Sequence, residues 1–271
     1  MSLGWSSDFS YGYFERILQA IKSNFELHLI SEAPQILNKI GQPKLILRHD
    51  VDVSLKRALR MAEIENEFGI CTTYMVMINS PLYCVEDTTS RGILLQLIGL
   101  GHEVGLHFRI DNDEHNINCD ISLLEAKIHS TCKRLENITG LPVLSISFHR
   151  PKPQFLRGPL MVSGRINAYS KELMGWYLSD SKGCWREGEP LPKLLNPDRP
   201  LLQLLIHPIW WGDAHMLPED RLQEFFDTET REQLSKCIRA FDVALATITG
   251  VQRRDFHNEG KEAENNEAWE I

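Results

Sequence analysis

The sequence has no apolar segment long enough to cross a membrane, no secretory signal and no stretch rich in lysine and arginine. A membrane-spanning helix needs about 18 consecutive apolar residues. A secretory signal begins with basic residues followed by an apolar core, and residues 1–20 lack this order. We therefore expect a cytoplasmic protein without a membrane span. The net charge of −8 argues against nucleic acid as a partner, because polyanions attract basic surfaces.

Cysteines are also few, and none of the six stands in a CxxC pair. They are too sparse for a disulfide framework, so we expect reduced thiols in a cytoplasmic compartment. The hydrophobic share of 42% and the charged share of 24% are those of a soluble globular protein. A chain of 271 residues fits two ordinary domains or one large α/β domain.

Short apolar segments that predict strands alternate with segments in which apolar residues recur at helical spacing. Such alternation predicts parallel strands joined by crossover helices, in either a doubly wound sheet or a barrel. Residues 152–170 and 186–200 are predicted loops. The expected strands are 45–52, 70–77, 102–108 and 143–149, and the expected helices are 13–25, 54–69, 91–101, 122–140 and 218–249.

Three of these predicted strands and two further apolar segments, WYLSDS and LLQLLIH, end in ionisable residues. In both architectures the carboxyl ends of parallel strands carry the chemistry, so these side chains are expected at one face. A single buried histidine is more often a structural core residue, but five such strand ends at one face are hard to explain in that way. The residues are Asp50, Asp52, His107, His149, Arg150, Asp180 and His207.

Aspartate and histidine side chains that converge at one face suit a divalent metal such as Zn²⁺. Catalytic zinc sites use three nitrogen or oxygen ligands and keep one position open for water. A bound metal polarises a carbonyl group and lowers the pKa of water, while a free carboxylate takes the proton. The pattern therefore predicts the hydrolysis of an amide or an ester.

From about Leu45 to Trp211 the sequence resembles the polysaccharide deacetylase family, carbohydrate esterase family four, and especially its cytoplasmic branch associated with surface-polysaccharide synthesis. The segments that carry the resemblance are RHDVD, GHEVGLH, FHRPKP, YLSDSKGCW and LLIHP. The resemblance implies a single-domain distorted (β/α) barrel, which we place at residues 1–253, followed by a charged tail at 254–271. It also implies metal-dependent removal of an acetyl group from an N-acetylated or O-acetylated saccharide.

The resemblance implies a role for each matched residue. Asp50 stands at the position of the general base and His207 at that of the general acid, while Arg150 orients the base and Asp180 lies near this arginine. Asp52 and His107 stand at metal-ligand positions. Leu205 belongs to an acetyl-sized pocket and Trp185 to an aromatic wall. The adjacent Trp210 and Trp211 are expected to form a sugar-stacking rim.

The third metal ligand has two candidates. Family members place a second histidine four residues after the first, and here that position holds Asp111. His149 ends a predicted strand, which holds a side chain more rigidly than a loop does, and it keeps the family's set of two histidines and one carboxylate. We therefore predict Asp52, His107 and His149 as the ligands of Zn²⁺, with Co, Mn or Ni as alternatives.

Two other functions are compatible with the sequence. A catalytically silent barrel that binds a carbohydrate would explain why the first motif contains the additional Val51 and why Asp111 replaces a histidine. An amide hydrolase that acts on a non-sugar small molecule would use the same residues. His49 and His102 are left outside the site, because His102 stands at the start of its strand, at the opposite face, and His49 is expected to bond backbone.

Overall fold

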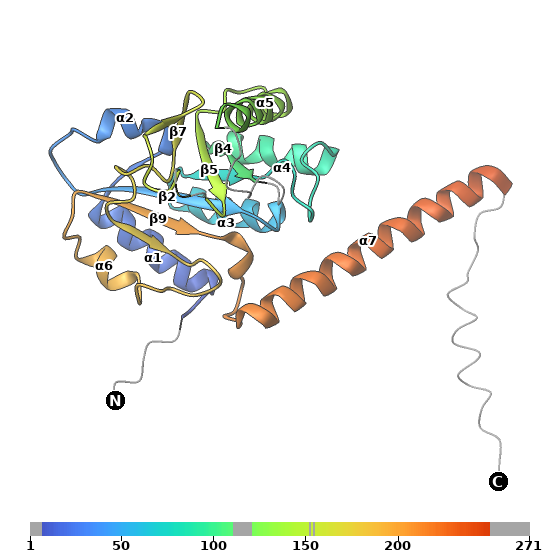
Figure 1. The fold of residues 1–271 in the computed structure, drawn as a ribbon. Coiled ribbons are helices and arrows are strands. Elements are labelled where there is room, and N and C mark those ends of the chain that lie inside the picture. Colours follow the sequence, from blue (N-terminus) through green and yellow to red (C-terminus); the bar gives the residue numbers. More distant parts are fainter. Residues whose placement is uncertain (1–6, 111–120, 152, 154, 250–271) are drawn as a thin grey trace, which may run out of the picture. The chain divides into compact units, whose positions relative to one another are not determined.

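The computed structural model describes residues 7–110, 121–151, 153 and 155–249 (Figure 1). The sheet and the helices that pack on it belong to one compact unit, Met1–Pro218. The described part of a second unit, Glu219–Ile271, is helical and belongs to α7 (Pro218–Thr249). The charged tail predicted at 254–271 lies outside the described residues. No helix in the described part of the chain is long and apolar enough to span a membrane.

The sheet contains nine strands, and eight of them follow the order β6-β7-β5-β4-β3-β2-β9-β8, while β1 pairs with β2. All pairs are parallel except β6 with β7. The strands are β1 (Glu26–His28), β2 (Lys44–Val51), β3 (Thr73–Val76), β4 (Glu103–Arg109), β5 (Ser145–His149), β6 (Met161–Val162), β7 (Arg165–Asn167), β8 (Tyr177–Ser179) and β9 (Leu201–Ile206). The helices before α7 are α1 (Tyr11–Asn24), α2 (Ala33–Ile36), α3 (Leu55–Glu67), α4 (Thr88–Gly99), α5 (Ile121–Thr139) and α6 (Leu191–Leu195), and two 3-10 turns are η1 (Ile30–Glu32) and η3 (Pro208–Trp210).

The sheet curls, so that side chains from strands that are not neighbours in the sheet pack together on its concave face. Ile46 of β2 and Met75 of β3 pack in one cluster with Ile166 of β7. Gln203 of β9 donates a hydrogen bond to the carbonyl oxygen of Ala168 at 2.9 Å. The strand order leaves β6 and β8 as the two ends, with no ladder joining β7 to β8 among the described residues. The predicted α/β barrel is therefore confirmed as an open, curled half-barrel.

The alternation of side chains along a strand separates the interior from the outer face. On β2, Leu45 and Leu47 pack outside, while Ile46 and Arg48 point into the curl. Gly105 on β4 lies at a closely packed point of the interior. A Cβ atom there would lie 2.5 Å from both Met75 Sδ and Ser145 Oγ, so a larger residue would displace these two side chains.

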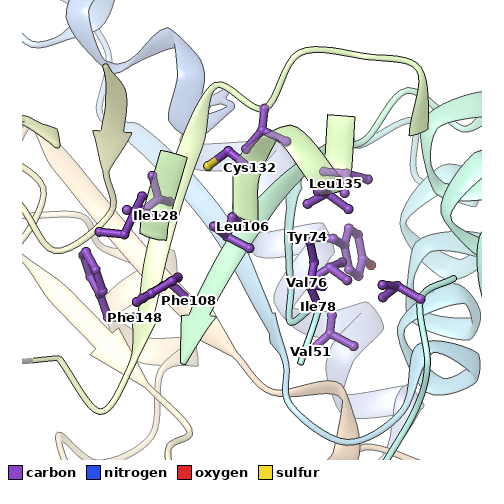
Figure 2. Packing of buried hydrophobic residues seen from close by; sticks show 14 of the residues in the cluster. Val51, Tyr74, Val76, Ile78, Leu106, Phe108, Ile128, Cys132, Leu135 and Phe148 are labelled. Atoms are coloured by element: carbon purple, nitrogen blue, oxygen red, sulfur yellow. The ribbon is translucent and has the colours of Figure 1, made fainter. Parts of the chain in front are cut away.

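Helices cover the outer face of the sheet. Figure 2 shows Leu106 and Phe148 from the strands packed with Ile128 and Leu135 of α5. A second cluster joins α1, α3 and α6 to the outward residues of β2 and β9. Each fully buried aliphatic or aromatic side chain contributes about 1.5–3 kcal/mol, so these clusters hold the strand ends in place. The four cysteines whose side chains are described, Cys71, Cys84, Cys132 and Cys184, are free thiols.

Helix starts follow their capping residues. The Ser54 side chain accepts a hydrogen bond from the Arg57 backbone N–H at 3.3 Å and begins α3, as the sequence predicts. The helix predicted at 91–101 begins three residues earlier, because Asp87 accepts from the Ser90 backbone N–H at 2.8 Å. The predicted loops 152–170 and 186–200 contain the short elements β6, β7 and α6.

Candidate metal centre

Three of the predicted site residues meet near the carboxyl ends of β2, β4 and β5. Asp52 follows β2, His107 lies in β4 and His149 ends β5. One donor atom from each lies within 4.8 Å of the others, which gives a group able to hold a metal ion. His107 Nε2 lies 3.0 Å from Asp52 Oδ1, and His149 Nδ1 lies 3.3 Å from the same oxygen. The alternative ligand, Asp111, lies outside the described residues.

The donor set fits a catalytic zinc ion. Ligands at about 2.0–2.1 Å from zinc in a tetrahedral site are about 3.3 Å from one another, close to the two distances from Asp52. The Asp52 side chain is 22% exposed and that of His149 is 33% exposed, so the group faces solvent on one side. This leaves an open position, as a catalytic zinc site needs.

Asp52 is ionised, which favours the binding of a cation at this site. Burial alone would raise the pKa of this carboxyl group, but hydrogen bonds from His107 and His149 hold its pKa well below the usual range. Asp52 is therefore a carboxylate throughout the physiological pH range. Two imidazole nitrogens and one carboxylate oxygen supply one negative charge, which suits a divalent ion with a water molecule.

Ser147 on β5 fixes the orientation of the His107 ring. The Ser147 hydroxyl lies 2.6 Å from His107 Nδ1 and donates to Asp50 Oδ1 at 3.3 Å. Because the hydroxyl proton is directed at Asp50, the Ser147 oxygen accepts from His107 Nδ1–H. With Nδ1 held by Ser147, Nε2 is the His107 nitrogen that faces Asp52 and would bind a metal once its proton is released, and ligand histidines are commonly oriented in this way.

Asp50, the predicted general base, is held by Arg48. Arg48 Nη2 donates to Asp50 Oδ2 at 3.0 Å, and Arg48 Nε lies 3.0 Å from Oδ1. Arg48 also donates to Gln203 Oε1 at 3.0 Å, and its guanidinium group lies 4.5 Å from the centre of the Tyr169 ring. Both Arg48 and Asp50 are buried.

Arg48 contacts Asp50 in the way that the resemblance implies for Arg150. That residue is exposed, follows β5 with a backbone φ of 59° and forms no salt bridge with any described residue. The left-handed backbone turns the chain away from the regular strand direction at this point. The guanidinium group beside Asp50 therefore belongs to Arg48, a residue to which the sequence motifs gave no role.

His207 and Asp180 form a second pair beside the metal group. His207 Nδ1 lies 2.6 Å from Asp180 Oδ1, and the His207 backbone N–H also donates to this carboxylate. Burial alone would lower the pKa of His207, but the charge of Asp180 outweighs it and raises the pKa to about 9. His207 Nε2 lies 3.9 Å from Asp52 Oδ2. A protonated His207 thus faces the group formed by Asp52, His107 and His149. Asp180 hydrogen-bonds this histidine rather than Arg150.

Two of the predicted aromatic contacts are structural. Trp211 is fully buried, and its Nε1 donates to Asp180 Oδ2 at 3.0 Å, so it positions Asp180 and cannot form a sugar-stacking rim. Trp185 is 5% exposed and stacks on Phe9 at 6.5 Å between ring centres, so it belongs to the core. Trp210 is half-buried. Leu205 is buried and lies opposite Ser179 and Arg48 in the strand register.

His49 and His102 lie outside this group of side chains. The His49 ring bonds Glu65 rather than backbone, and its Nδ1 has no hydrogen-bond partner among the described residues. His49 Nε2 lies 2.6 Å from Glu65 Oε1 on the outer face of the sheet. Tyr74 and Thr72 donate to Glu65 Oε2 at 2.7 and 2.9 Å. His102 Nδ1 accepts from the Thr72 backbone N–H at 3.1 Å. This buried network joins α3 to β3.

Comparisons with known proteins give partial likenesses. No family model matches the sequence, and no curated protein sequence matches it. The structure is similar to a Streptococcus pyogenes deacetylase in complex with acetate, with 13% identity and a TM-score of 0.41 over 78% of this chain and 84% of that chain. A family 4 carbohydrate esterase from Bacillus anthracis aligns with 15% identity and a TM-score of 0.39 over 86% and 89%.

A pseudoenzyme of carbohydrate esterase family four from Bacillus anthracis is also similar, with 17% identity and a TM-score of 0.40. The alignment covers 70% of this chain but 60% of that chain, so less than two thirds of the other protein is matched. TM-scores near 0.4 are too low to define a shared fold. The function proposed below therefore rests on the side chains of the site.

Proposed function

We propose that the protein is a metal-dependent hydrolase that removes an acetyl group from an N-acetylated or O-acetylated saccharide. The observation that carries the proposal is the Asp52, His107 and His149 group, with a buried carboxylate and a protonated histidine beside it. Zn²⁺ suits the donor set best, and Co, Mn and Ni are the alternatives. Such a site supplies a base, an acid and an electrophile for acyl transfer.

A metal bound by these three residues would polarise the acetyl carbonyl and lower the pKa of a water molecule. Asp50 takes the proton of the attacking water, and Arg48 and Ser147 hold its carboxylate toward the site. His207 gives a proton to the leaving nitrogen or oxygen of the sugar. Asp180 keeps His207 protonated and oriented, because it accepts from both the ring and the backbone N–H.

The sequence motifs support a saccharide as the substrate and the cytoplasm as the location of the reaction. The segments around His107 and His207 resemble those of polysaccharide deacetylases, and buried Leu205 lies beside the catalytic strand ends, where an acetyl methyl group would bind. We place the activity in the cytoplasm, in the synthesis of a surface polysaccharide, within a barrel domain of residues 1–253. A silent barrel would have no need for a solvent-facing ligand group beside an acid and a base, so we favour the active enzyme.

Metal content and acetate release test the proposal together. Protein purified without a chelator is expected to contain about one zinc ion per chain and to release acetate from at least one of a panel of acetylated sugars. His149→Ala is expected to lose both, while His129→Ala, at an exposed position on α5, keeps both.

Other outcomes separate the alternatives. Stoichiometric metal without acetate release from any sugar, but with hydrolysis of cyclic amides, indicates the non-sugar hydrolase. Absence of stoichiometric metal indicates the silent barrel. If Asp50→Asn removes the metal as well as the turnover, Asp50 is a ligand rather than the base.

A further inference from the structure

A pocket of about 380 Å³ lies beside β8, at one end of the strand order. Three positively charged side chains line it, Arg157, Lys193 and Arg199, together with one carboxylate, Glu187. We call it the cationic pocket. It shares no residue with the group formed by Asp52, His107 and His149, so it is a separate feature of the surface.

The charge in this pocket is opposite to that of the whole protein. Three cations and one anion give its wall a formal charge of +2, whereas the chain carries −8. Like charges in a concave site repel one another and attract anions from solution. The three cations in this wall therefore give it a local field suited to an anionic ligand.

The carboxylates of the protein leave this charge largely uncompensated. Among the described residues, neither Arg157 nor Lys193 forms a salt bridge with a carboxylate. Arg199 Nε lies 4.0 Å from Asp198 Oδ1, and both side chains are more than half exposed, so this contact contributes little. Arg199 Nη1 donates to the Gly175 carbonyl oxygen at 3.1 Å, which ties the guanidinium group to the segment before β8.

The backbone of Arg157 points to a role for its side chain. Its φ of 58° lies in the left-handed region, which residues with a side chain rarely adopt and glycine adopts readily. The conformation is held by a hydrogen bond of 2.7 Å from the Arg157 backbone N–H to the Tyr169 carbonyl oxygen. Because the side chain is exposed, packing does not explain an arginine at this position. Strained residues of this kind cluster at ligand sites.

We propose that the cationic pocket binds an oxyanion of the phosphate class, as free phosphate or as the phosphate group of an organic ligand. Guanidinium groups match the oxygen geometry of phosphate, and a lysine ammonium group adds a point charge. The pocket is larger than one phosphate, and Trp176 and Tyr177 also line it. This aromatic wall suits the carbon skeleton of a phosphorylated sugar.

Calorimetric titration of the full chain tests the proposal. The protein is treated with chelator, so that phosphate cannot bind a metal at the other site, and is titrated with inorganic phosphate, glucose 1-phosphate and glucose. We expect one saturable site for the two phosphates, none for glucose, and an affinity that falls as NaCl is raised. Tighter binding of glucose 1-phosphate than of phosphate identifies a phosphorylated organic ligand, and equal binding identifies free phosphate.

Variants locate the site. Arg157→Gly removes the charge without adding backbone strain, and we expect about tenfold weaker binding from the loss of a charge-assisted hydrogen bond. Arg157→Gln and Arg199→Gln are expected to show losses of the same order. Arg186→Gln removes one positive charge next to Glu187 but outside the pocket wall, and it should bind as the unmodified protein does.

Two results overturn the proposal. One is the absence of saturable binding by either phosphate. The other is an equal loss of affinity in Arg186→Gln and Arg157→Gln, because this would assign the attraction to the general surface charge. Neither result bears on the proposed deacetylation, since the titration is made without metal and the variants leave the metal-binding residues unchanged.

Discussion

Replacing Arg48 with methionine tests whether this residue, rather than Arg150, holds the proposed base. Methionine keeps part of the stem volume but removes the charge that contacts Asp50 at 3.0 Å. Asp50 is 1% exposed, so its carboxylate would remain buried without a counter-charge. Removing one partner of a buried ion pair costs about 3–5 kcal/mol. We expect the free energy of unfolding to fall by about that amount.

Urea unfolding of the metal-free protein measures this loss, with Arg150→Met as the matched control. Arg150 is exposed, so its substitution should change the free energy of unfolding by less than about 0.5 kcal/mol. Adding Asp50→Asn to Arg48→Met removes the unpaired charge. The double variant should therefore be more stable than Arg48→Met alone, since removal of both charges of such a pair is often neutral.

Turnover gives the second measurement. At a temperature where both variants are folded and loaded with metal, Arg48→Met should release acetate more slowly than Arg150→Met does. The reasoning is refuted if Arg150→Met has the larger effect on turnover. It is also refuted if Arg48→Met destabilises the protein by less than about 1 kcal/mol and the double variant shows no coupling.

Three further predictions concern other groups. Ser147→Ala should weaken zinc binding about 10–100-fold in a competition titration, as expected for an outer partner of a ligand histidine, while Ser145→Ala on the same strand should not. His207→Ala should slow amide cleavage more than cleavage of an activated ester, whose leaving group needs no proton; equal losses would exclude the acid role. Burial would raise the pKa of Glu65, but the charge of His49 lowers this pKa overall. The ionised Glu65 therefore stabilises the folded protein at a pH above its unfolded-state pKa of about 4.3. This stabilisation is lost as the pH falls through the lower pKa of the folded state. Unfolding measured between pH 6 and 3 should therefore depend less on pH in Glu65→Gln, and a slope equal to that of the unmodified protein would contradict this.

The alternation of strands and helices was predictable because its signals are local. Ser54 caps the helix that it precedes, and Gly69 and Gly101 take left-handed conformations close after their helices. The placement of Asp52, His107 and His149 at one edge followed from one rule, since parallel strands bring their carboxyl ends together, and the resemblance then implied Asp52 and His107 as metal ligands. His149 was placed in this group by the end of its strand, and the structure brings it within reach of Asp52.

The remaining features depend on contacts between distant parts of the chain. Strands of two or three residues, such as Met161–Val162 and Arg165–Asn167, carry too little pattern to be distinguished from a loop. The burial of Trp185 depends on Phe9, a residue near the opposite end of the sequence. Trp211 packs against the same phenylalanine, at 5.4 Å between ring centres. No local pattern around either tryptophan indicates this partner.

The contact between Arg48 and the proposed base Asp50 could have been predicted from the sequence. Side chains two residues apart on a strand point to the same face, so Arg48 and Asp50 had to be neighbours once β2 was assigned as a strand. The hydrogen bond from Arg48 to Gln203 on β9 then holds the guanidinium group from the adjacent strand. Arg150 lies beyond the end of β5, where the left-handed backbone breaks this alternation. The alternation of side chains along β2 therefore places the guanidinium group of Arg48 beside the proposed base Asp50, and the same strand leads into the proposed metal ligand Asp52.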